Sequence, residues 1–252
     1  MLTSQRKQHI LEVLRRDGQV VAKRLSQELG LSEDTIRRDL RELAQDGLLQ
    51  RVHGGALPAS PAVVDFAGRE ELSINAKRMI GRAAALLIKD GQVVFVDGGT
   101  TAVQLVRQLP RALRATIVTH SARIAVELVA HPNVEVILIG GRMFKHSIVS
   151  VGAVALEAIS HIRADMYFMG VTGIHPDAGL STGDLEEAYV KQAFCKRAAD
   201  TYVLASQEKL GAASQYVVVA LTEVSGLIVD AAVSDEVLLP YRTLGLNIIR
   251  AA

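Results

Sequence analysis

The chain has 252 residues, of which 49% are hydrophobic and 22% are charged, and its formal net charge at pH 7 is +1. This length exceeds one typical domain and provides enough apolar side chains for a sizeable core. The composition excludes an internal disulfide, because Cys195 is the single cysteine, and no apolar run approaches the roughly 18 residues of a membrane-spanning helix.

The positions of the charged residues and of the histidines and cysteine exclude further classes of function. Residues 1–57 carry ten Lys and Arg against eight Asp and Glu, so the arrangement of charges rather than their sum must indicate any nucleic-acid partner. The seven histidines show no paired ligand spacing, and Cys195 lies in a helical pattern that suits a buried thiol. We therefore expect no metal site, no cofactor and no cysteine nucleophile. The amphipathic N-terminal stretch is not signal-like, which predicts a cytoplasmic protein.

Three helices are predicted at the start of the chain, and a turn containing glycine joins the last two. Apolar residues recur at helical spacing between residues 4 and 16, and the glycine of "DGQV" then interrupts them. "VAKRLSQELG" repeats the pattern and ends at Gly30, the position expected just after a helix. Ser32 is a good N-cap for a third helix with acidic residues in its first turn. A short helix, a turn containing glycine and another helix predict a helix-turn-helix.

The third helix, in "GLSEDTIRRDLRELAQDG", carries two kinds of side chain on opposite faces. Successive residues of a helix are 100° apart, which places Ile36, Leu40, Leu43 and Ala44 on one apolar face. This face would pack on the preceding helices. The opposite face consists of Thr35, Arg38, Arg41 and Gln45. Arg37 falls on the flank near Asp39 and the first helix, which suggests a partly structural role. A recognition helix enters the major groove with its N-terminal end first, where arginine can bind guanine O6 and N7 bidentately.

The same arginines also fit a solvated helix face with ion pairs to Asp34, Asp39 and Glu42. The following "GLLQRVHGGA" favours DNA binding, because a glycine stop, two leucines and a basic tight turn suit a small β-wing. Side chains on such a wing can reach phosphates or the minor groove, and its glycines, Gly54 and Gly55, allow close approach. The candidate DNA-contacting residues are Ser32, Thr35, Arg37, Arg38, Arg41, Arg51, His53 and Gly54.

Residues 1–57 as a whole resemble a known family. The run from "RRDGQVV" through "TIRRDL" to "HGGA" closely resembles, without a gap, the DNA-binding domain of the DeoR family of bacterial transcriptional regulators. The resemblance implies a winged helix-turn-helix domain that binds double-stranded operator DNA. We assign residues 1–57 to this domain.

The rest of the chain changes in character twice. "LPASPAVVDFAG" has no helical period, and we expect residues 58–69 to form an interdomain linker. From about residue 70, buried strands such as "QVVFVD", "ATIVTH" and "VEVILIGG" alternate with helices such as "TTAVQLVRQL" and "SARIAVELVAH". This alternation predicts an α/β domain over residues 70–252, with a mainly parallel sheet and helices on both faces.

Ligands of such sheets bind beyond the carboxyl ends of the strands, which identifies three candidate loops. "DGGTT", residues 97–101, offers glycines and the hydroxyls of Thr100 and Thr101 at a helix N-terminus, which suits a phosphate group. Ser121 follows the second strand, and the third strand is followed by Gly140, Gly141 and Arg142. A dinucleotide site is disfavoured, because the sequence contains no GxGxxG.

Two later stretches are polar for their setting. "GLSTGDLEEAYVKQAF" places Glu187 and Lys191 four residues apart on one helix, and Lys209 follows the end of a strand. For Glu187 and Lys191, the spacing alone favours an exposed helical ion pair that contributes a few tenths of a kcal/mol.

Residues 70–250 look like the sensor domain of the DeoR family, whose fold is similar to that of ribose-5-phosphate isomerase and related sugar-phosphate-binding proteins. The matching motifs are "DGGTT", "VT.S", "GG", "GL.T....EEA.VK.A" and the pair Lys209 and Gly211. The resemblance implies that the phosphate of a phosphorylated sugar is held by Gly99, Thr100, Thr101 and Ser121. It also implies that contacts to hydroxyls or charge come from Asp97, Glu187, Lys191 and Lys209. From the third loop, Arg142 is added as an effector-binding candidate.

The chain departs from the family pattern at three positions. His120 and Thr172 each stand where asparagine is usual, and Ser206 occupies the position of an aspartate. These changes bear on the polarity of the site and on the identity of the ligand.

These observations predict a repressor of a sugar or carbohydrate operon, whose DNA affinity changes when a phosphorylated sugar binds. We expect a dimer or tetramer on repeated half-sites, because a single winged helix buries too little surface for a tight complex. One alternative is a sugar-phosphate isomerase that uses Glu187, Asp165 and Lys191. The fused DNA-binding domain and the missing carboxylate at Ser206 argue against an enzyme. A second alternative is an architectural protein that binds DNA through phosphates alone.

Overall fold

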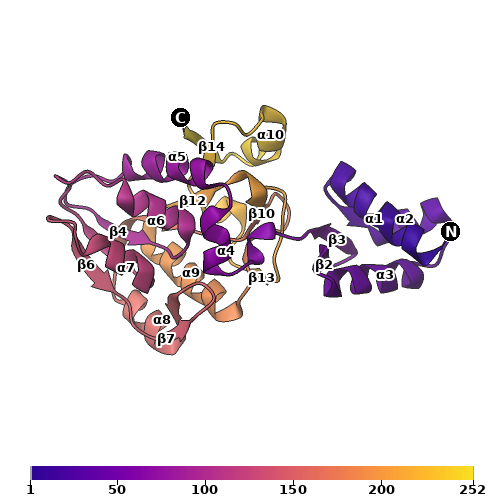
Figure 1. Ribbon diagram of the computed structural model, residues 1–252, viewed down its shortest axis with the longest axis horizontal. Coiled ribbons are helices and arrows are strands. Elements are labelled where there is room, and N and C mark those ends of the chain that lie inside the picture. The colour runs from indigo at the N-terminus through magenta and orange to yellow at the C-terminus, as the bar shows by residue number, and fades with distance from the viewer. Residues whose placement is uncertain (1, 252) are drawn as a thin grey trace.

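The computed structural model describes residues 2–251, which form two bodies joined by one stretch of chain (Figure 1). The helices of the smaller, N-terminal body are α1 (Thr3–Asp17), α2 (Ala22–Leu29) and α3 (Glu33–Gln45). Its short strands pair antiparallel in the order β1-β3-β2 and are β1 (Val20–Val21), β2 (Leu49–Val52) and β3 (Gly55–Pro58). A helix-turn-helix followed by a β-hairpin confirms the predicted winged helix-turn-helix.

An apolar stripe on each helix closes the core of this small body. Ile10 of α1, Leu25 of α2 and Leu40 of α3 are each at most 2% exposed. Gly18 and Gly30 follow α1 and α2 with φ angles of 70° and 63°. Glycine adopts this left-handed conformation without the steric cost of a side chain, so both helices end where the sequence predicts.

A buried ion pair ties α1 to α3. The Arg6 guanidinium binds both carboxylate oxygens of Asp39, with Nη2 2.9 Å from Oδ1, and Asp39 is fully buried. The alternative interpretation, in which Asp39 pairs with the arginines of α3 on the surface, is therefore wrong for Asp39. Asp39 lies between Ile36 and Leu43 on the inward face of the helix, because residues three and four apart share one face.

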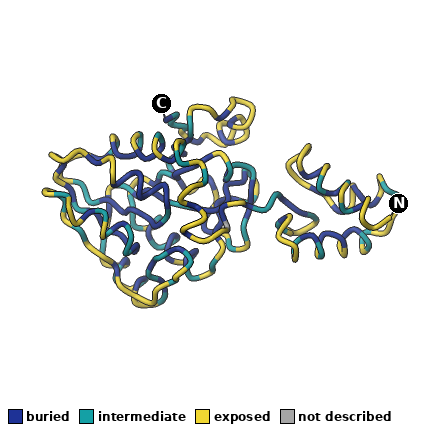
Figure 2. The backbone as a smooth tube through the Cα atoms, in the orientation of Figure 1, coloured by how far each residue is buried: buried dark blue, intermediate teal, exposed yellow. Residues whose placement is uncertain are grey.

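The stretch after the small body packs on the large one and is partly helical. It contains a 3-10 turn, η1 (Pro61–Val63), and a helix, α4 (Phe66–Glu71), which corrects the expectation of no helical structure between residues 58 and 69. The Asp65 carboxylate caps α4 by accepting a hydrogen bond from the Gly68 amide at 2.9 Å. Ser60 and Ala62 are buried, and the Ser60 hydroxyl donates to the Thr172 carbonyl of the larger body. Figure 2 shows the backbone of both bodies and of the connection coloured by burial.

Within the described residues, seven strands form the central sheet of the larger body in the order β15-β14-β12-β9-β4-β5-β6. Every neighbouring pair is parallel. The strands are β4 (Val93–Val96), β5 (Thr116–Thr119), β6 (Glu135–Leu138), β9 (Ala164–Met169), β12 (Ala198–Ala205), β14 (Gly226–Asp230) and β15 (Asn247–Ala251). The α/β class and the parallel sheet are confirmed.

Helices cover both faces of this sheet, as predicted (Figure 1). Alternate residues of a strand point to opposite faces, so Val94 and Val96 belong to one apolar core and Phe95 to the other. The first core also receives side chains from α5 (Ile74–Ala85), α6 (Thr100–Arg107) and α7 (Ala122–Leu128). The second receives them from α8 (Ala153–Ser160), α9 (Leu185–Arg197) and α10 (Asp235–Thr243).

Shorter elements follow the carboxyl ends of three central strands. After β6 comes an antiparallel pair, β7 (Arg142–Phe144) and β8 (Val149–Val151). After β9 and β12 come β10 (Gly173–His175), β11 (Gly179–Thr182), η2 (Gln207–Lys209), β13 (Tyr216–Val217) and η3 (Leu221–Glu223). None of the helices between residues 2 and 251 is long and apolar enough to span a bilayer.

Candidate functional site

The N-terminus of α3 is capped by two predicted DNA-contacting residues. The Ser32 hydroxyl accepts a hydrogen bond from the Thr35 amide at 3.2 Å and shares another with the Thr35 hydroxyl at 3.0 Å. This cap satisfies one of the amides that a helix N-terminus leaves free. Both side chains remain at the surface, where they can also meet a phosphate of DNA.

The three arginines of α3 are all exposed, but they are not equivalent. Arg37 pairs with Glu33 at 2.8 Å, a contact within the chain that fits the partly structural role expected for this residue. In residues 2–251, Arg38 and Arg41 have no carboxylate within 4.0 Å. The ion-paired alternative loses two of its acids, because Asp39 binds Arg6 and Glu42 lies 2.8 Å from Lys7. Arg38 and Arg41 are therefore open to a partner outside the chain.

The wing presents the other predicted contacts at the tip of the β2–β3 hairpin. Arg51, His53 and Gly54 are exposed, and Gly54 has a φ of 79° that favours glycine at the turn. Gly55 has a different reason to be glycine, since a Cβ there would lie 1.8 Å from the Val20 carbonyl oxygen. Close packing of β3 on β1, rather than approach to DNA, accounts for Gly55.

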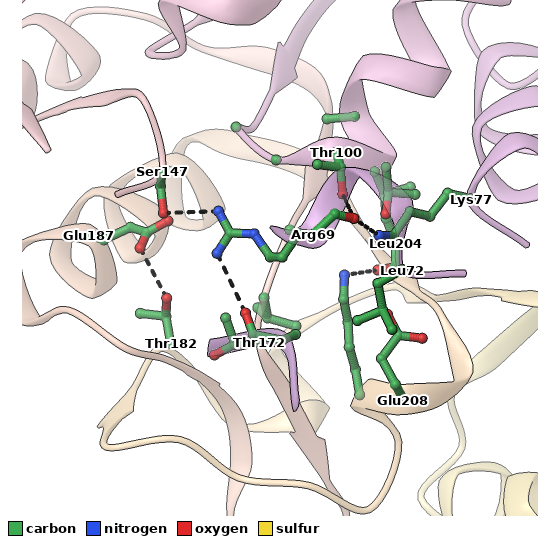
Figure 3. Close-up of a pocket in the computed structure, with 18 of the residues that line it drawn as sticks. Arg69, Leu72, Lys77, Thr100, Ser147, Thr172, Thr182, Glu187, Leu204 and Glu208 are labelled. Carbon is green, nitrogen blue, oxygen red and sulfur yellow. Dashed lines mark hydrogen bonds between the residues drawn. The ribbon is translucent and has the colours of Figure 1, made fainter. Parts of the chain in front are cut away.

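The larger body contains a polar pocket beyond the carboxyl ends of its central strands, built from segments far apart in the sequence (Figure 3). It has a volume of about 40 Å³. The connecting stretch and α5 contribute Arg69 and Lys77, and the loops after β4, β9 and β12 contribute Gly99, Thr100, Thr101, Thr172 and Lys209. The opposite wall consists of Ser147, Thr182, Glu187 and Lys191, and Glu208 lies near Lys209.

Six of the nine predicted effector-binding residues line this pocket, namely Gly99, Thr100, Thr101, Glu187, Lys191 and Lys209. Asp97 and Ser121 are fully buried beside it and do not line it. Arg142 is placed elsewhere, because its exposed side chain pairs with Glu186 at the surface. The prediction for Arg142 is therefore corrected: a glycine pair after an edge strand turned the chain away from the pocket.

Asp97 organises the floor of the pocket. Its carboxylate accepts hydrogen bonds from Lys191 Nζ at 2.6 Å, from the Tyr167 hydroxyl at 2.9 Å and from the Gly170 amide at 2.8 Å. Burial alone would raise the pKa of Asp97, but the charge of Lys191 and the hydrogen bond from His120 hold it well below its usual value. Asp97 thus positions Lys191 and has no free oxygen for a ligand.

His120, one of the departures from the family pattern, belongs to the same network. Its Nε2 lies 2.8 Å from Asp97 Oδ1, and its Nδ1 lies 2.9 Å from the Ser150 carbonyl oxygen. The two ring nitrogens therefore each face a hydrogen-bond acceptor. Histidine at this position still donates to Asp97, as an asparagine amide would.

Glu187 and Lys191 do form an ion pair, but it is buried rather than exposed. Their charged groups lie 3.2 Å apart, and the two residues are 7% and 2% exposed. Attraction to Asp97 and Glu187 raises the pKa of Lys191, although burial alone would lower it. The Thr182 hydroxyl donates to the second oxygen of Glu187 at 3.1 Å. Sequence spacing revealed the pair but could not reveal that the helix face is covered.

Three further cations in the pocket lack an acidic partner. Arg69, Lys77 and Lys209 are at most 9% exposed, and the described chain places no carboxylate within 4.0 Å of them. Burial lowers the pKa of Arg69 and of Lys77. Burial lowers the pKa of Lys209 to about 8, and the charges of Lys77 and Arg69 add to this effect. Arg69 and Lys77 were missed in the sequence, because one lies in the expected linker and the other in an ordinary amphipathic helix.

The side chains that line the pocket therefore carry an excess of positive charge. Four are cationic, Arg69, Lys77, Lys191 and Lys209, against two acidic ones, Glu187 and Glu208. The N-terminus of α6 adds the partial positive charge of its free amides beside Thr100 and Thr101. Burying unpaired cations is costly, so this arrangement is complementary to a small anion.

The groups needed for isomerase chemistry do not converge here. Asp165 lies at the amino end of β9, where its carboxylate accepts a hydrogen bond from the Val93 amide at 2.8 Å. The Ser206 hydroxyl donates to Glu208 at 2.6 Å, and the Thr172 hydroxyl lies 2.7 Å from that of Ser214. Of the three groups expected for the enzyme, Glu187 and Lys191 alone line the pocket.

Comparisons with known proteins match both parts of the chain. The family profile of the DeoR-like helix-turn-helix domain matches residues 6–61, and that of the DeoR C terminal sensor domain matches residues 72–231. The HTH-type transcriptional regulator GlpR of Haloferax volcanii is 33% identical over 252 residues, covering 99% of this chain and 98% of that protein. The glycerol-3-phosphate regulon repressor of Escherichia coli (strain K12) is 31% identical over 212 residues, 84% of each chain.

A ribose 5-phosphate isomerase from Methanocaldococcus jannaschii aligns with 54% of this chain and 54% of its own, at 16% identity and a TM-score of 0.41. The two profiles cover the winged helix-turn-helix and most of the larger body, and the relative from Haloferax volcanii matches over almost the full length of both proteins. The chain therefore belongs to the DeoR family of transcriptional regulators.

Proposed function

We propose that the protein is a repressor of a carbohydrate operon whose affinity for operator DNA changes when a phosphorylated sugar binds the polar pocket. The observation that carries this proposal is the set of three buried cations without acidic partners, Arg69, Lys77 and Lys209, beside the N-terminus of α6. A dianionic phosphate would offset the cost of burying them. The name of the Escherichia coli relative, which refers to a phosphorylated polyol, supports the same class of ligand.

The two walls of the pocket suit the two ends of such a ligand. Gly99, Thr100 and Thr101 offer backbone amides and hydroxyls at a helix N-terminus, with Lys77 and Lys209 nearby, which favours the phosphate end. Thr182 and Glu187 on the opposite wall can accept hydrogen bonds from sugar hydroxyls. Ser121 and Asp97 act beneath the pocket, where Ser121 caps α7 by accepting from the Ile124 amide at 3.4 Å.

On the DNA side, we propose that the N-terminal half of α3 enters the major groove and that the wing reaches the backbone. Arg38 and Arg41 are the base-reading candidates, because they are exposed and free of intramolecular ion pairs in the described chain. Ser32, Thr35, Arg37, Arg51, His53 and Gly54 would contact phosphates. The protein would act in the cytoplasm as a dimer or tetramer, with residues 1–57 binding DNA and residues 70–252 sensing the ligand.

We propose that the pocket binds its ligand without turning it over. An isomerase needs a carboxylate free to remove a proton from carbon. Glu187 is held by Lys191 and Thr182, and Asp165 is remote from the pocket. Turnover of ribose 5-phosphate by the purified protein, lost in Glu187→Gln, would reverse this view.

The test is fluorescence anisotropy of a labelled DNA fragment from upstream of the protein's own gene, at fixed salt because phosphate contacts make affinity salt-dependent. Protein is titrated with and without a pool of sugar phosphates, and random DNA is the control. The proposal expects tighter binding to the upstream fragment than to random DNA, and a change in that affinity when the pool is added. Equal binding to both DNAs, or an affinity that no sugar phosphate changes, would contradict it.

A further inference from the structure

Arg69 belongs to the pocket through its side chain and to the connection between the two domains through its place in the sequence. It lies on α4, which follows the wing strand β3 and the turn η1. The guanidinium extends across the pocket, between Ser147 and Glu187 on one side and Lys77 and Thr100 on the other (Figure 3). No other part of the connecting stretch places a charged side chain on the pocket wall among the described residues.

The guanidinium of Arg69 is poorly satisfied by the protein itself. Nη1 lies 3.5 Å from the Ala62 carbonyl oxygen and Nη2 lies 3.4 Å from the Ser147 hydroxyl, which are long distances for hydrogen bonds. A guanidinium has five N–H donors in a planar fork that matches two oxygens of a phosphate or carboxylate. An anion in the pocket would therefore make stronger contacts with Arg69 than its present neighbours do.

The backbone of Arg69 holds two donors that an anion would also use. The Arg69 carbonyl oxygen accepts hydrogen bonds from Lys77 Nζ and from the Thr100 hydroxyl, the latter at 3.4 Å. A phosphate at the N-terminus of α6 competes with this carbonyl for both donors. Binding thus attracts the side chain of Arg69 and at the same time releases its backbone, so α4 cannot keep the same contacts in the two states.

The stretch before α4 is fastened to the same pocket and leads directly to the wing. The Ser60 hydroxyl donates to the carbonyl of Thr172, a pocket residue, and the Phe66 amide donates to the His146 carbonyl at 3.1 Å. The Ala213 amide donates to the carbonyl of Pro58, the last residue of β3, at 3.1 Å. Ordered contacts with the larger body therefore continue along the chain from α4 to the last residue of the wing.

We infer that Arg69 is the residue through which a bound anion acts on the DNA-binding domain. The anionic group of the ligand binds the guanidinium, α4 shifts with it, and residues 59–66 transmit the shift to the wing strand β3. This inference rests on the proposed function, since it requires the pocket to bind an anion. A ligand can change an equilibrium only through different contacts in the two states, and Arg69 supplies that difference.

The experiment uses the full chain and inorganic phosphate as the probe, and it compares the wild type with Arg69→Met. Arg78→Met is the matched control, because Arg78 is an exposed arginine on α5 next to Lys77. Phosphate affinity is measured by calorimetry. Amide hydrogen exchange is then measured at equal occupancy for three segments, the α6 N-terminus at 98–103, the connecting stretch at 59–72, and the wing at 49–58.

For the wild type and Arg78→Met, phosphate is expected to change exchange in all three segments. Arg69→Met should bind phosphate about tenfold more weakly, yet at equal occupancy it should respond at 98–103 and not at 59–72 or 49–58. The same response in all three segments of Arg69→Met would overturn the inference and leave the proposed function intact. A wild type that binds phosphate nowhere, with no response at 98–103, would instead overturn the proposed function and the inference with it.

A second variant guards against misfolding of Arg69→Met. Ser60→Ala removes the hydrogen bond to the Thr172 carbonyl without altering a side chain that lines the pocket. It should keep the phosphate affinity of the wild type within about twofold and lose most of the change at 49–58. A full response at 49–58 in Ser60→Ala would show that the signal does not pass through residues 59–66.

Discussion

Arg38 and Lys209 both lack an acidic partner within the described chain, but one is exposed and the other is buried. The energetic consequence therefore differs between them. Arg38 is exposed on α3, so water solvates its guanidinium. Lys209 is 7% exposed and donates to the Leu204 carbonyl at 3.3 Å, so its ammonium has lost most of its water. The charge of Arg38 therefore costs the folded protein little free energy. The charge of Lys209 destabilises the folded protein unless an anion neutralises it.

Arg38→Ala is expected to weaken binding to the cognate operator by about 1 to 3 kcal/mol, because a bidentate contact with guanine is lost. Binding to random DNA should change little. Anisotropy titrations of both DNAs at one salt concentration measure the difference. Arg37→Ala is the control, since Arg37 is paired with Glu33 and should affect both DNAs alike. Equal losses for Arg38→Ala on the two DNAs would favour the architectural alternative.

Lys209→Met is expected to increase the free energy of unfolding at pH 7 by about 1 to 3 kcal/mol, because a buried cation is replaced by an apolar side chain of similar length. The pKa of Lys209 is about 8 in the folded protein and 10.5 in its ordinary state. Below pH 8 the lysine is charged in both states, so its penalty is complete there. The penalty decreases as the pH rises above 8, because the folded protein then releases the proton first.

Urea denaturation in phosphate-free buffer at pH 7 and pH 9 measures this effect. The stability gain of Lys209→Met should be smaller at pH 9 than at pH 7. Lys196→Met, which changes an exposed lysine on α9, should show no such difference. A loss of stability in Lys209→Met at pH 7 would mean that the ammonium is stabilised by contacts other than those described.

From the residues alone, individual pocket residues were predictable where the chemistry was local, and the family resemblance added Glu187, Lys191 and Lys209. Thr100 and Thr101 were predicted because they follow a strand and open a helix within one short motif. Arg69 and Lys77 were not, since nothing near them in the sequence distinguishes them from surface cations. Arg69 contacts Ser147 and Lys77 contacts the Arg69 carbonyl, and periodicity does not encode such tertiary contacts.

At the scale of elements, α3 illustrates what periodicity can and cannot predict. Its N-cap and apolar face follow from local rules, and both were predicted correctly. Asp39 lies on the same inward face as Ile36 and Leu40. The 100° rotation per residue of a helix therefore suffices to predict that Asp39 points into the domain. Its partner Arg6 is 33 residues away, and a pairing over that distance has no sequence signature.

Arg6→Met is expected to destabilise the DNA-binding domain by about 3 to 5 kcal/mol, because the fully buried Asp39 carboxylate would lose its counterion. Hydrogen exchange of the core amides of α3 measures the free energy of opening. Lys7→Met, which breaks the partly exposed pair with Glu42, should destabilise the domain much less, because water screens this pair. If the two variants opened α3 equally, the buried pair would contribute no more than a surface pair.

At the scale of the whole molecule, the class and the parallel sheet were predictable because strands and helices alternate along the chain. The position of the pocket also followed, since ligands of such sheets bind beyond the carboxyl ends of strands. The strand order was not predictable, because β9 inserts beside β4 through contacts between segments that are far apart in the sequence. This crossover is what brings Thr172 and Lys191 to the loop that carries Thr100.

A single winged helix offers a small surface to DNA, so we expect the protein to bind operator DNA as an oligomer. A duplex with two half-sites should bind at least about tenfold more tightly than one with a single half-site, when the spacing is one helical turn or a multiple of it. Anisotropy with both duplexes, together with sedimentation velocity of the free protein, tests this. A monomer in solution that binds both duplexes equally would contradict the expectation.

The wing strand ends at Pro58, and the Pro58 carbonyl and Ala59 already contact Ala213 of the larger body. The chain therefore has no flexible linker between its winged helix-turn-helix domain and its sensor domain. A long flexible linker would let each DNA-binding domain find a half-site independently of the other. Because this chain has no such linker, we expect the arrangement of the sensor domains in an oligomer to set the distance and angle between the DNA-binding domains. If two copies pair through their sensor domains, we expect that pairing to set the half-site spacing that the protein recognises on an operator.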